Sequence, residues 1–302
     1  MLNERVTIIL RTPAVDDLGD VVRALGEWQH EDETLALHPG DVGWFGRFGA
    51  SATAAALRTW SRDERILAVG LLDGPGVLRL GVAPEARHDD ELATRMLVDV
   101  SQPERGVLGH DAVLEARSGA RLRRLLIEAG WVLDESWTPL RRDLSGPVAE
   151  SGLRVRLTQP ESAQVRAALQ RAAFEGSTFT EQRWRAMAES PAYADARCLV
   201  GFHGDSAVAA VTVWSAGPGR PGLLEPMGVH RDHRGHGYGR SICLAAAGAL
   251  REMGASSAVV CTPSANVGAV ATYESAGFIS LGPVRDFRRA VEGQGRLASV
   301  PV

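Results

Sequence analysis

The pattern of apolar and polar positions is clearest in the second half of the chain. Short apolar runs typical of strands lie at 198–202, 207–214, 223–229, 258–261 and 278–281. Helical spacing of apolar positions covers 160–174, 179–189, 238–253 and 266–275. Gly204-Asp205 predicts a hairpin turn and Gly254 a helix end. These elements predict a mixed α+β fold built around a central sheet.

The first half repeats this pattern at a constant offset of 147 residues. Three landmarks recur: Thr12-Pro13 as Gln159-Pro160, the Gly81–Arg87 stretch as Gly228–Arg234, and Ala129-Gly130-Trp131 as Ala276-Gly277-Phe278. One shared offset for three landmarks indicates a tandem repeat of one domain. We predict a first domain over 1–146 and a second over 147–302, joined near the turn-rich stretch 145–152.

Composition narrows the classes of protein. The chain has 302 residues, of which 45% are hydrophobic, a length that suits two globular domains. Its net charge of −4 argues against general nucleic-acid binding, and it has no apolar run long enough to span a bilayer. All 33 basic residues are arginine, which excludes lysine Schiff-base chemistry. The N-terminus lacks a secretion signal, so we expect a soluble, cytoplasmic protein, monomeric or homodimeric, without nucleic-acid or membrane partners.

A glycine-rich turn precedes the helix predicted at 238–253. Alternate glycines let backbone N–H groups point to one side and form an anion-binding nest, to which the helix N-terminus adds its positive dipole end. Arginines flank the turn and supply full charges for phosphate oxygens. The turn runs Arg234, Gly235, His236, Gly237, Tyr238, Gly239, Arg240. We interpret it as a diphosphate site, although tight packing alone also explains such glycines.

A second motif lies in the segment 266–278. Asn266 and Tyr273 are seven residues apart and share one helix face, about 10 Å apart along the axis. Asn266 can pair with amide groups of a ligand lying on that face, and Tyr273 can present its hydroxyl to it. By itself, Tyr273 is better explained as a core residue with a solvated hydroxyl.

Together the two motifs resemble the GNAT superfamily of acyl-CoA-dependent N-acetyltransferases. The resemblance covers Val229 through Arg240, with the Arg-x-x-Gly-x-Gly pattern, and the later Asn-x-x-Ala-x-x-x-Tyr-x-x-x-Gly-Phe pattern that begins at Asn266. It departs from the family pattern at Arg231, where proline is common. The resemblance implies two tandem domains, each with a mixed, mostly antiparallel sheet flanked by helices. It also implies that the fourth and fifth strands of the working copy splay apart around acetyl-CoA.

The resemblance assigns roles to particular residues. The acetyl-CoA-binding residues would be Met227, Gly228, Val229, Arg234, Gly235, His236, Gly237, Tyr238, Gly239, Arg240 and Asn266. A small-molecule amine would attack the thioester directly, a backbone N–H near Val229 would stabilise the oxyanion, and Tyr273 would protonate the leaving thiolate. Glu225 is the candidate base, or else a strand residue paired with an arginine. No metal is expected, because His230, His233 and His236 lie on a loop.

The first copy lacks the residues of this chemistry. At the same offset the turn glycines become His88, Asp90 and Leu92, Asn266 becomes Gly119, and Tyr273 becomes Leu126. Carboxylates at 89–91 would repel a diphosphate. We therefore predict that the first copy binds no acetyl-CoA and supports the second. The stretch Gly43–Gly49 either lines the acceptor pocket or packs between the domains.

Two alternatives remain open from the sequence. A non-catalytic acyl-CoA-binding sensor would keep the cofactor clamp but would not need Tyr273 and Glu225. Within the enzymes, the tandem layout with a degenerate first copy is similar to mycothiol synthase, whereas antibiotic or polyamine acetylation suits the motifs equally well. Cys261, at the end of the fifth strand of the second copy, is interpreted as a packing residue.

Overall fold

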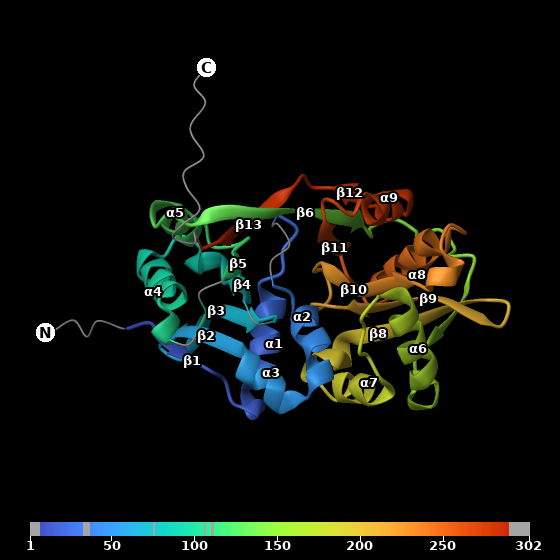
Figure 1. The fold of residues 1–302 in the computed structure, drawn as a ribbon, viewed down its shortest axis with the longest axis horizontal. Helices are drawn as coiled ribbons and strands as arrows, with labels where there is room; N and C mark the ends of the chain where they lie inside the picture. The colour runs from blue at the N-terminus through green and yellow to red at the C-terminus, as the bar shows by residue number, and fades with distance from the viewer. Residues whose placement is uncertain (1–6, 33–36, 75, 106, 110–111, 290–302) are drawn as a thin grey trace, which may run out of the picture.

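One sheet runs through the whole molecule. The computed structural model describes residues 7–32, 37–74, 76–105, 107–109 and 112–289, and over these residues the sheet has thirteen strands with helices packed against it (Figure 1). The predicted mixed α+β class is confirmed. No helix in the described ranges is both long and apolar enough to cross a membrane.

The first copy supplies β1 to β6 and α1 to α5, which form most of the left half of Figure 1. Its strands are β1 (Ile9–Arg11), β2 (Leu57–Arg62), β3 (Arg65–Leu72), β4 (Val77–Val82), β5 (Val113–Glu115) and β6 (Val132–Asp143). Its α-helices are α1 (Leu18–Glu27), α2 (Pro39–Phe45), α3 (Ala50–Ala56), α4 (Asp90–Ser101) and α5 (Ala120–Glu128).

The second copy follows a similar order and, apart from β13, lies in the right half of Figure 1. Its strands are β7 (Arg154–Leu157), β8 (Ala196–His203), β9 (Ser206–Trp214), β10 (Gly222–Val229), β11 (Ser257–Pro263), β12 (Ile279–Ser280) and β13 (Val284–Arg288). Its α-helices are α6 (Ala163–Ala173), α7 (Glu181–Ala188), α8 (Tyr238–Glu252) and α9 (Val267–Ser275). The strands and helices predicted for this copy are therefore present, with ends shifted by a few residues, and β13 was not predicted.

The two copies exchange their last long strands. The sheet order is β1-β2-β3-β4-β5-β13-β6-β11-β10-β9-β8-β7, so β13 of the second copy pairs with β5 of the first, and β6 of the first pairs with β11 of the second. Figure 1 shows β6 running from one half of the molecule to the other. Phe287 of β13 is buried in the first copy's core, and Leu140 of β6 in the second copy's core. Each core is thus completed by the other copy.

Helix α2 also crosses the boundary and packs on Trp214 of β9. A Cβ atom on Gly43 would come within 2.3 Å of the Trp214 indole, and one on Gly40 within 2.5 Å of Trp214 Cβ. Glycine is required at both positions because the helix backbone lies directly against the ring. Trp44 stacks at a tilt on Phe179, 5.2 Å between ring centroids. The stretch Gly43–Gly49 therefore packs between the two copies.

Candidate active site

Strands β10 and β11 separate and leave a cleft between them. They are parallel neighbours but pair only at Gly222 with Ala258 and at Leu223 with Val259. Beyond Leu223, the backbone groups of β10 that face β11 have no partner strand among the described strands. A bulge between Leu224 and Met227 inserts one extra residue into β10 and changes the direction of Glu225. The splayed fourth and fifth strands expected from the sequence are present.

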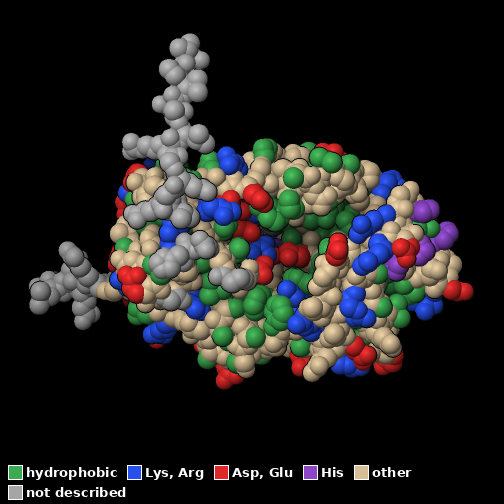
Figure 2. Space-filling view, in the orientation of Figure 1, with side chains coloured by type: hydrophobic (Ala, Val, Ile, Leu, Met, Phe, Trp, Pro, Cys, Tyr) green, Lys and Arg blue, Asp and Glu red, His purple; other side chains and the backbone are tan. Residues whose placement is uncertain are grey.

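A cavity of about 380 Å³ occupies this cleft, a volume in the range of small-molecule sites. Four residues that the sequence assigned to the active site line it: Glu225, Met227, Asn266 and Tyr273. Its remaining wall comes partly from the first copy, through Asp73, Arg79, Glu115, Arg117 and Trp137. Figure 2 shows the hollow at the centre of the molecule, with acidic and basic side chains inside it. Residues of both copies therefore form the site.

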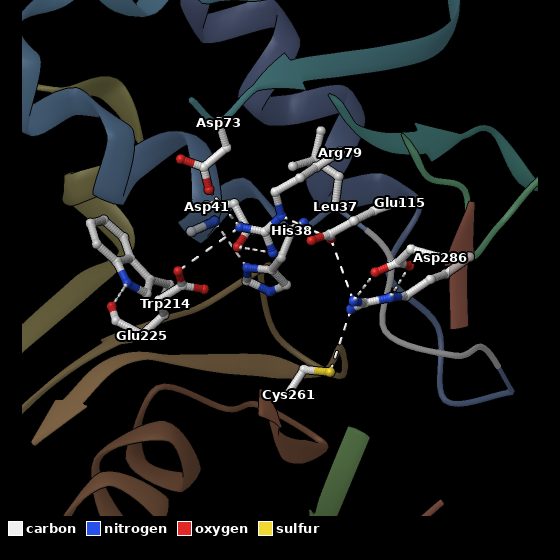
Figure 3. Close-up of polar contacts among 12 residues, drawn as sticks. Leu37, His38, Asp41, Asp73, Arg79, Glu115, Trp214, Glu225, Cys261 and Asp286 are labelled. Carbon is white, nitrogen blue, oxygen red and sulfur yellow. Dashed lines mark hydrogen bonds and ion pairs between the residues drawn. The ribbon is translucent and has the colours of Figure 1, made fainter. Parts of the chain in front are cut away.

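Glu225 points into the cavity from β10. Trp214 Nε1 donates a 2.6 Å hydrogen bond to the Glu225 carbonyl and fixes the bulge, while the Glu225 carboxylate lies 3.9 Å from Arg79 Nη1 (Figure 3). Burial and the adjacent Asp41 carboxylate raise the pKa of Glu225 well above its ordinary value, against the opposing effect of Arg79. Glu225 is thus both paired with an arginine and a stronger base than an ordinary glutamate.

Tyr273 and Cys261 line the opposite side of the cavity. Tyr273 is 6% exposed, and burial raises the pKa of its phenol far above the ordinary value, so it holds its proton at neutral pH. Burial also raises the pKa of the Cys261 thiol to about 11. A protonated thiol is a poor nucleophile, which disfavours an acyl-enzyme at Cys261. Its sulfur accepts a 3.5 Å contact from Arg117 Nη1.

Alternating charges from both copies form the wall next to Glu225. Arg79 lies 2.8 Å from Asp41 and 3.1 Å from Glu115. Arg117 lies 3.5 Å from Glu115 and 3.3 Å from Asp286, which β13 brings from the second copy. Figure 3 shows Arg79 and Glu115 between Asp73 and Asp286.

The glycine-rich turn has the geometry of an anion site. Gly235 and Gly237 both have φ of +79°, and Gly237 precedes the first residue of α8. A Cβ atom added to either would meet nothing within 4 Å, so the space in front of the helix N-terminus is open. The first N–H groups of α8 have no partner within the helix and are available to an anion. The turn therefore fits the diphosphate of acetyl-CoA.

Two other glycines of the predicted cofactor site have packing roles. A Cβ atom on Gly228 would lie 2.7 Å from the Phe174 ring, and one on Gly239 would lie 2.7 Å from Thr272 of α9. Gly239 thus lets α8 and α9 approach each other closely.

The predicted phosphate arginines contact helix C-termini. Arg234 Nη2 donates to the Ala173 carbonyl at the end of α6, and Arg240 Nε donates to the Ser275 carbonyl at the end of α9. Asn266 caps α9, its side-chain oxygen accepting from the Ala269 N–H at 3.2 Å. These contacts hold the turn against α6 and α9. The roles of these residues toward acetyl-CoA stay predictions.

In the first copy, side chains of the protein itself occupy the places that correspond to the anion-binding turn and the cleft. Asp89 caps α4, accepting from the Leu92 N–H at 2.8 Å, and it also pairs with Arg62. A carboxylate thus lies where an anion would bind. The Ser118 hydroxyl oxygen accepts from the Val82 N–H at 3.2 Å and joins the ends of β4 and β5 where β10 and β11 separate. That this copy binds no acetyl-CoA stays a prediction.

Sequence reasoning did not find the charged wall. Arg79 and Glu115 each stand in a short apolar strand, a pattern that marks a buried or functional charge. Comparison of the two copies also distinguishes Arg79, because the position that corresponds to it in the second copy is Pro226. Asp41 and Asp73 have no comparable pattern. Among the described residues, no three histidine, cysteine or acidic side chains are arranged to hold a metal ion.

Comparison with known proteins identifies the family and the fold. Residues 164–278 match the model of the Acetyltransferase (GNAT) family. A GCN5-related N-acetyltransferase from Sphaerobacter thermophilus is similar over 96% of both chains, with 20% identity and a TM-score of 0.54. A tandem GNAT protein from the clavulanic acid biosynthesis pathway covers 93% of this chain and 98% of its own, with 15% identity and a TM-score of 0.59. No curated protein matches the sequence.

Residues 164–278 are therefore a GNAT-family domain, and the whole chain has the tandem GNAT fold. Acetyltransferases of this family generally use acetyl-CoA. The particular similarity to mycothiol synthase stays a prediction.

Proposed function

We propose that the protein transfers an acetyl group from acetyl-CoA to a primary amine of a small molecule, at one site in the second copy. The observation that carries this proposal is the meeting of Glu225, Met227, Asn266 and Tyr273 around one cavity in the β10–β11 cleft. The open, positive-φ turn at the N-terminus of α8 supplies the place for the diphosphate. Acetyl-CoA, when bound, supplies the thioester carbonyl that the amine attacks.

The side chains at the cavity suit the two proton transfers of this reaction. Glu225 takes a proton from the acceptor amine, and its raised pKa brings it closer to the pKa of that amine. Tyr273 remains protonated and is the candidate donor to the leaving sulfur. Its raised pKa makes the phenol a weaker acid than usual, so it stabilises the thiolate first through a hydrogen bond. The backbone N–H groups of β10 on the cleft side face the carbonyl oxygen and stabilise its developing charge.

The test is release of the CoA thiol from acetyl-CoA across a panel of amines, together with calorimetric binding of acetyl-CoA. Tyr273→Phe removes the proton donor without removing the ring, so we expect turnover to fall by tenfold or more while acetyl-CoA still binds. Gly237→Glu forces a side chain at φ +79° and adds a negative charge to the turn, so both binding and turnover should be lost.

Gly248→Ala is the matched control, because this glycine lies in α8 and a Cβ atom there meets nothing within 4 Å. It should retain both activities. Turnover that survives Gly237→Glu would place the chemistry elsewhere. Tight binding of acetyl-CoA with no turnover on any amine would instead favour an acyl-CoA-binding sensor.

A further inference from the structure

Acidic side chains outnumber basic ones in the cavity wall and directly behind it. Five carboxylates surround two guanidinium groups: Asp41, Asp73, Glu115, Glu225 and Asp286 around Arg79 and Arg117. Arg79 alone has four carboxylates within 4 Å. Both arginines are thus already engaged by acidic partners. Glu225 is left out of the charge balance because its pKa is raised, and Arg47 also acts electrostatically on Asp73 and Glu225. Asp41, Asp73, Glu115 and Asp286 still outnumber the three guanidinium groups.

Asp73 and Glu225 are the acidic residues that are paired most loosely with Arg79. Asp73 and Glu225 approach the same nitrogen, Arg79 Nη1, at 3.6 and 3.9 Å, whereas Asp41 and Glu115 hold the guanidinium at 2.8 and 3.1 Å. The side chains of Asp73 and Glu225 are 40% and 31% exposed, against 1% for Asp41. The two most loosely held acidic side chains therefore face the open cavity, one from each copy.

Apolar side chains lie beside this pair of carboxylates. Trp137, Phe174, Pro226 and Met227 line the same cavity. They offer contact to a hydrocarbon skeleton, while the two carboxylates offer charge-assisted hydrogen bonds to ammonium groups. An acceptor with an anionic group would meet the excess carboxylates at an energetic cost.

We propose that the acceptor is a small diamine or polyamine, whose reacting amine lies at Glu225 and whose second ammonium group is bound by Asp73 of the first copy. The proposal rests on the proposed function for the reacting amine, whereas the second ammonium site stands on the geometry of the wall. It gives the first copy a direct part in acceptor binding.

Three probes that share a five-carbon amine skeleton test it: pentylamine, with one cation; cadaverine, with two; and lysine, which adds a carboxylate to the skeleton of cadaverine. Their affinities are measured by calorimetry on the full chain saturated with CoA, at fixed ionic strength. Cadaverine should bind about tenfold or more tightly than pentylamine, since a charge-assisted hydrogen bond is added. Lysine should bind more weakly than cadaverine.

Variants assign the preference to Asp73. Asp73→Asn should remove the preference for cadaverine over pentylamine, and Asp73→Glu should restore part of it. Asp205→Asn is the matched control, since this aspartate is fully exposed on the β8–β9 hairpin and paired only loosely with Arg154. It should leave the preference unchanged.

Equal affinities for cadaverine and pentylamine, tightest binding of lysine, or binding of none of the probes would overturn the proposal. A preference that persists in Asp73→Asn would overturn it too. Acetyl transfer to pentylamine and cadaverine with equal kcat/KM would leave the proposed function standing without the diamine site. A preference for cadaverine that depends on Asp73, with no acetyl transfer to any amine, would support the diamine site and contradict the proposed function.

Discussion

Protonation of His38 should weaken the contact between the two copies as the pH falls. His38 is fully buried at the start of α2, where its Nδ1 accepts from the Gly40 N–H at 2.9 Å and its Nε2 lies 3.2 Å from the Pro221 carbonyl. Both contacts are satisfied together by the neutral ring with its proton on Nε2. A second proton would turn Nδ1 into a donor that faces the Gly40 N–H.

The size of the effect follows from the shift in pKa. Burial lowers the pKa of His38 from 6.5 to about 4. Between pH 7 and pH 5, the unfolded chain takes up a proton at this position and the folded protein does not. The free energy of unfolding should therefore fall by about 2 kcal/mol over this interval through His38 alone. Glu225 acts in the opposite direction, because its raised pKa lets the folded state take up a proton first.

A variant separates His38 from the other titrating groups. His38→Asn keeps a side-chain oxygen to accept from Gly40 but does not titrate. Urea unfolding of both proteins at pH 7 and pH 5 gives the difference in their free energies of unfolding at each pH. This difference should move by about 2 kcal/mol in favour of the variant on acidification. A difference that is the same at both pH values would refute the reasoning.

Two further predictions concern packing and the first copy. Gly43→Ala should destabilise the protein by about 1–3 kcal/mol in urea unfolding, because the new methyl group would overlap Trp214, whereas Gly248→Ala has open space and should stabilise it by about 0.5–1 kcal/mol. Similar effects of both changes would contradict the role of Trp214. Asp89→Ala should cost about 1 kcal/mol through the lost helix cap. Native mass spectrometry should still find one acetyl-CoA per chain, and two would contradict the closed first site.

Local features of the chain were predicted well because short-range chemistry determines them. Helical spacing located α8, and glycines able to adopt positive φ located the turn before it. The constant offset of the landmarks indicated the repeat: α5 and α9 begin and end 147 residues apart. Tyr273 and Asn266 could be assigned to one face because a single helix positions both.

Only the tertiary structure decided which copy completes which sheet and what faces the cavity. Strand β13 was missed because its partner strands, β5 and β6, belong to the first copy, more than 140 residues earlier. Asp73 and Arg79 reach Glu225 for the same reason: their meeting depends on how two domains pack, and no periodicity within either strand encodes it. The sequence determined the elements and the anion-binding turn by itself, whereas contacts between the copies built the acidic wall of the site.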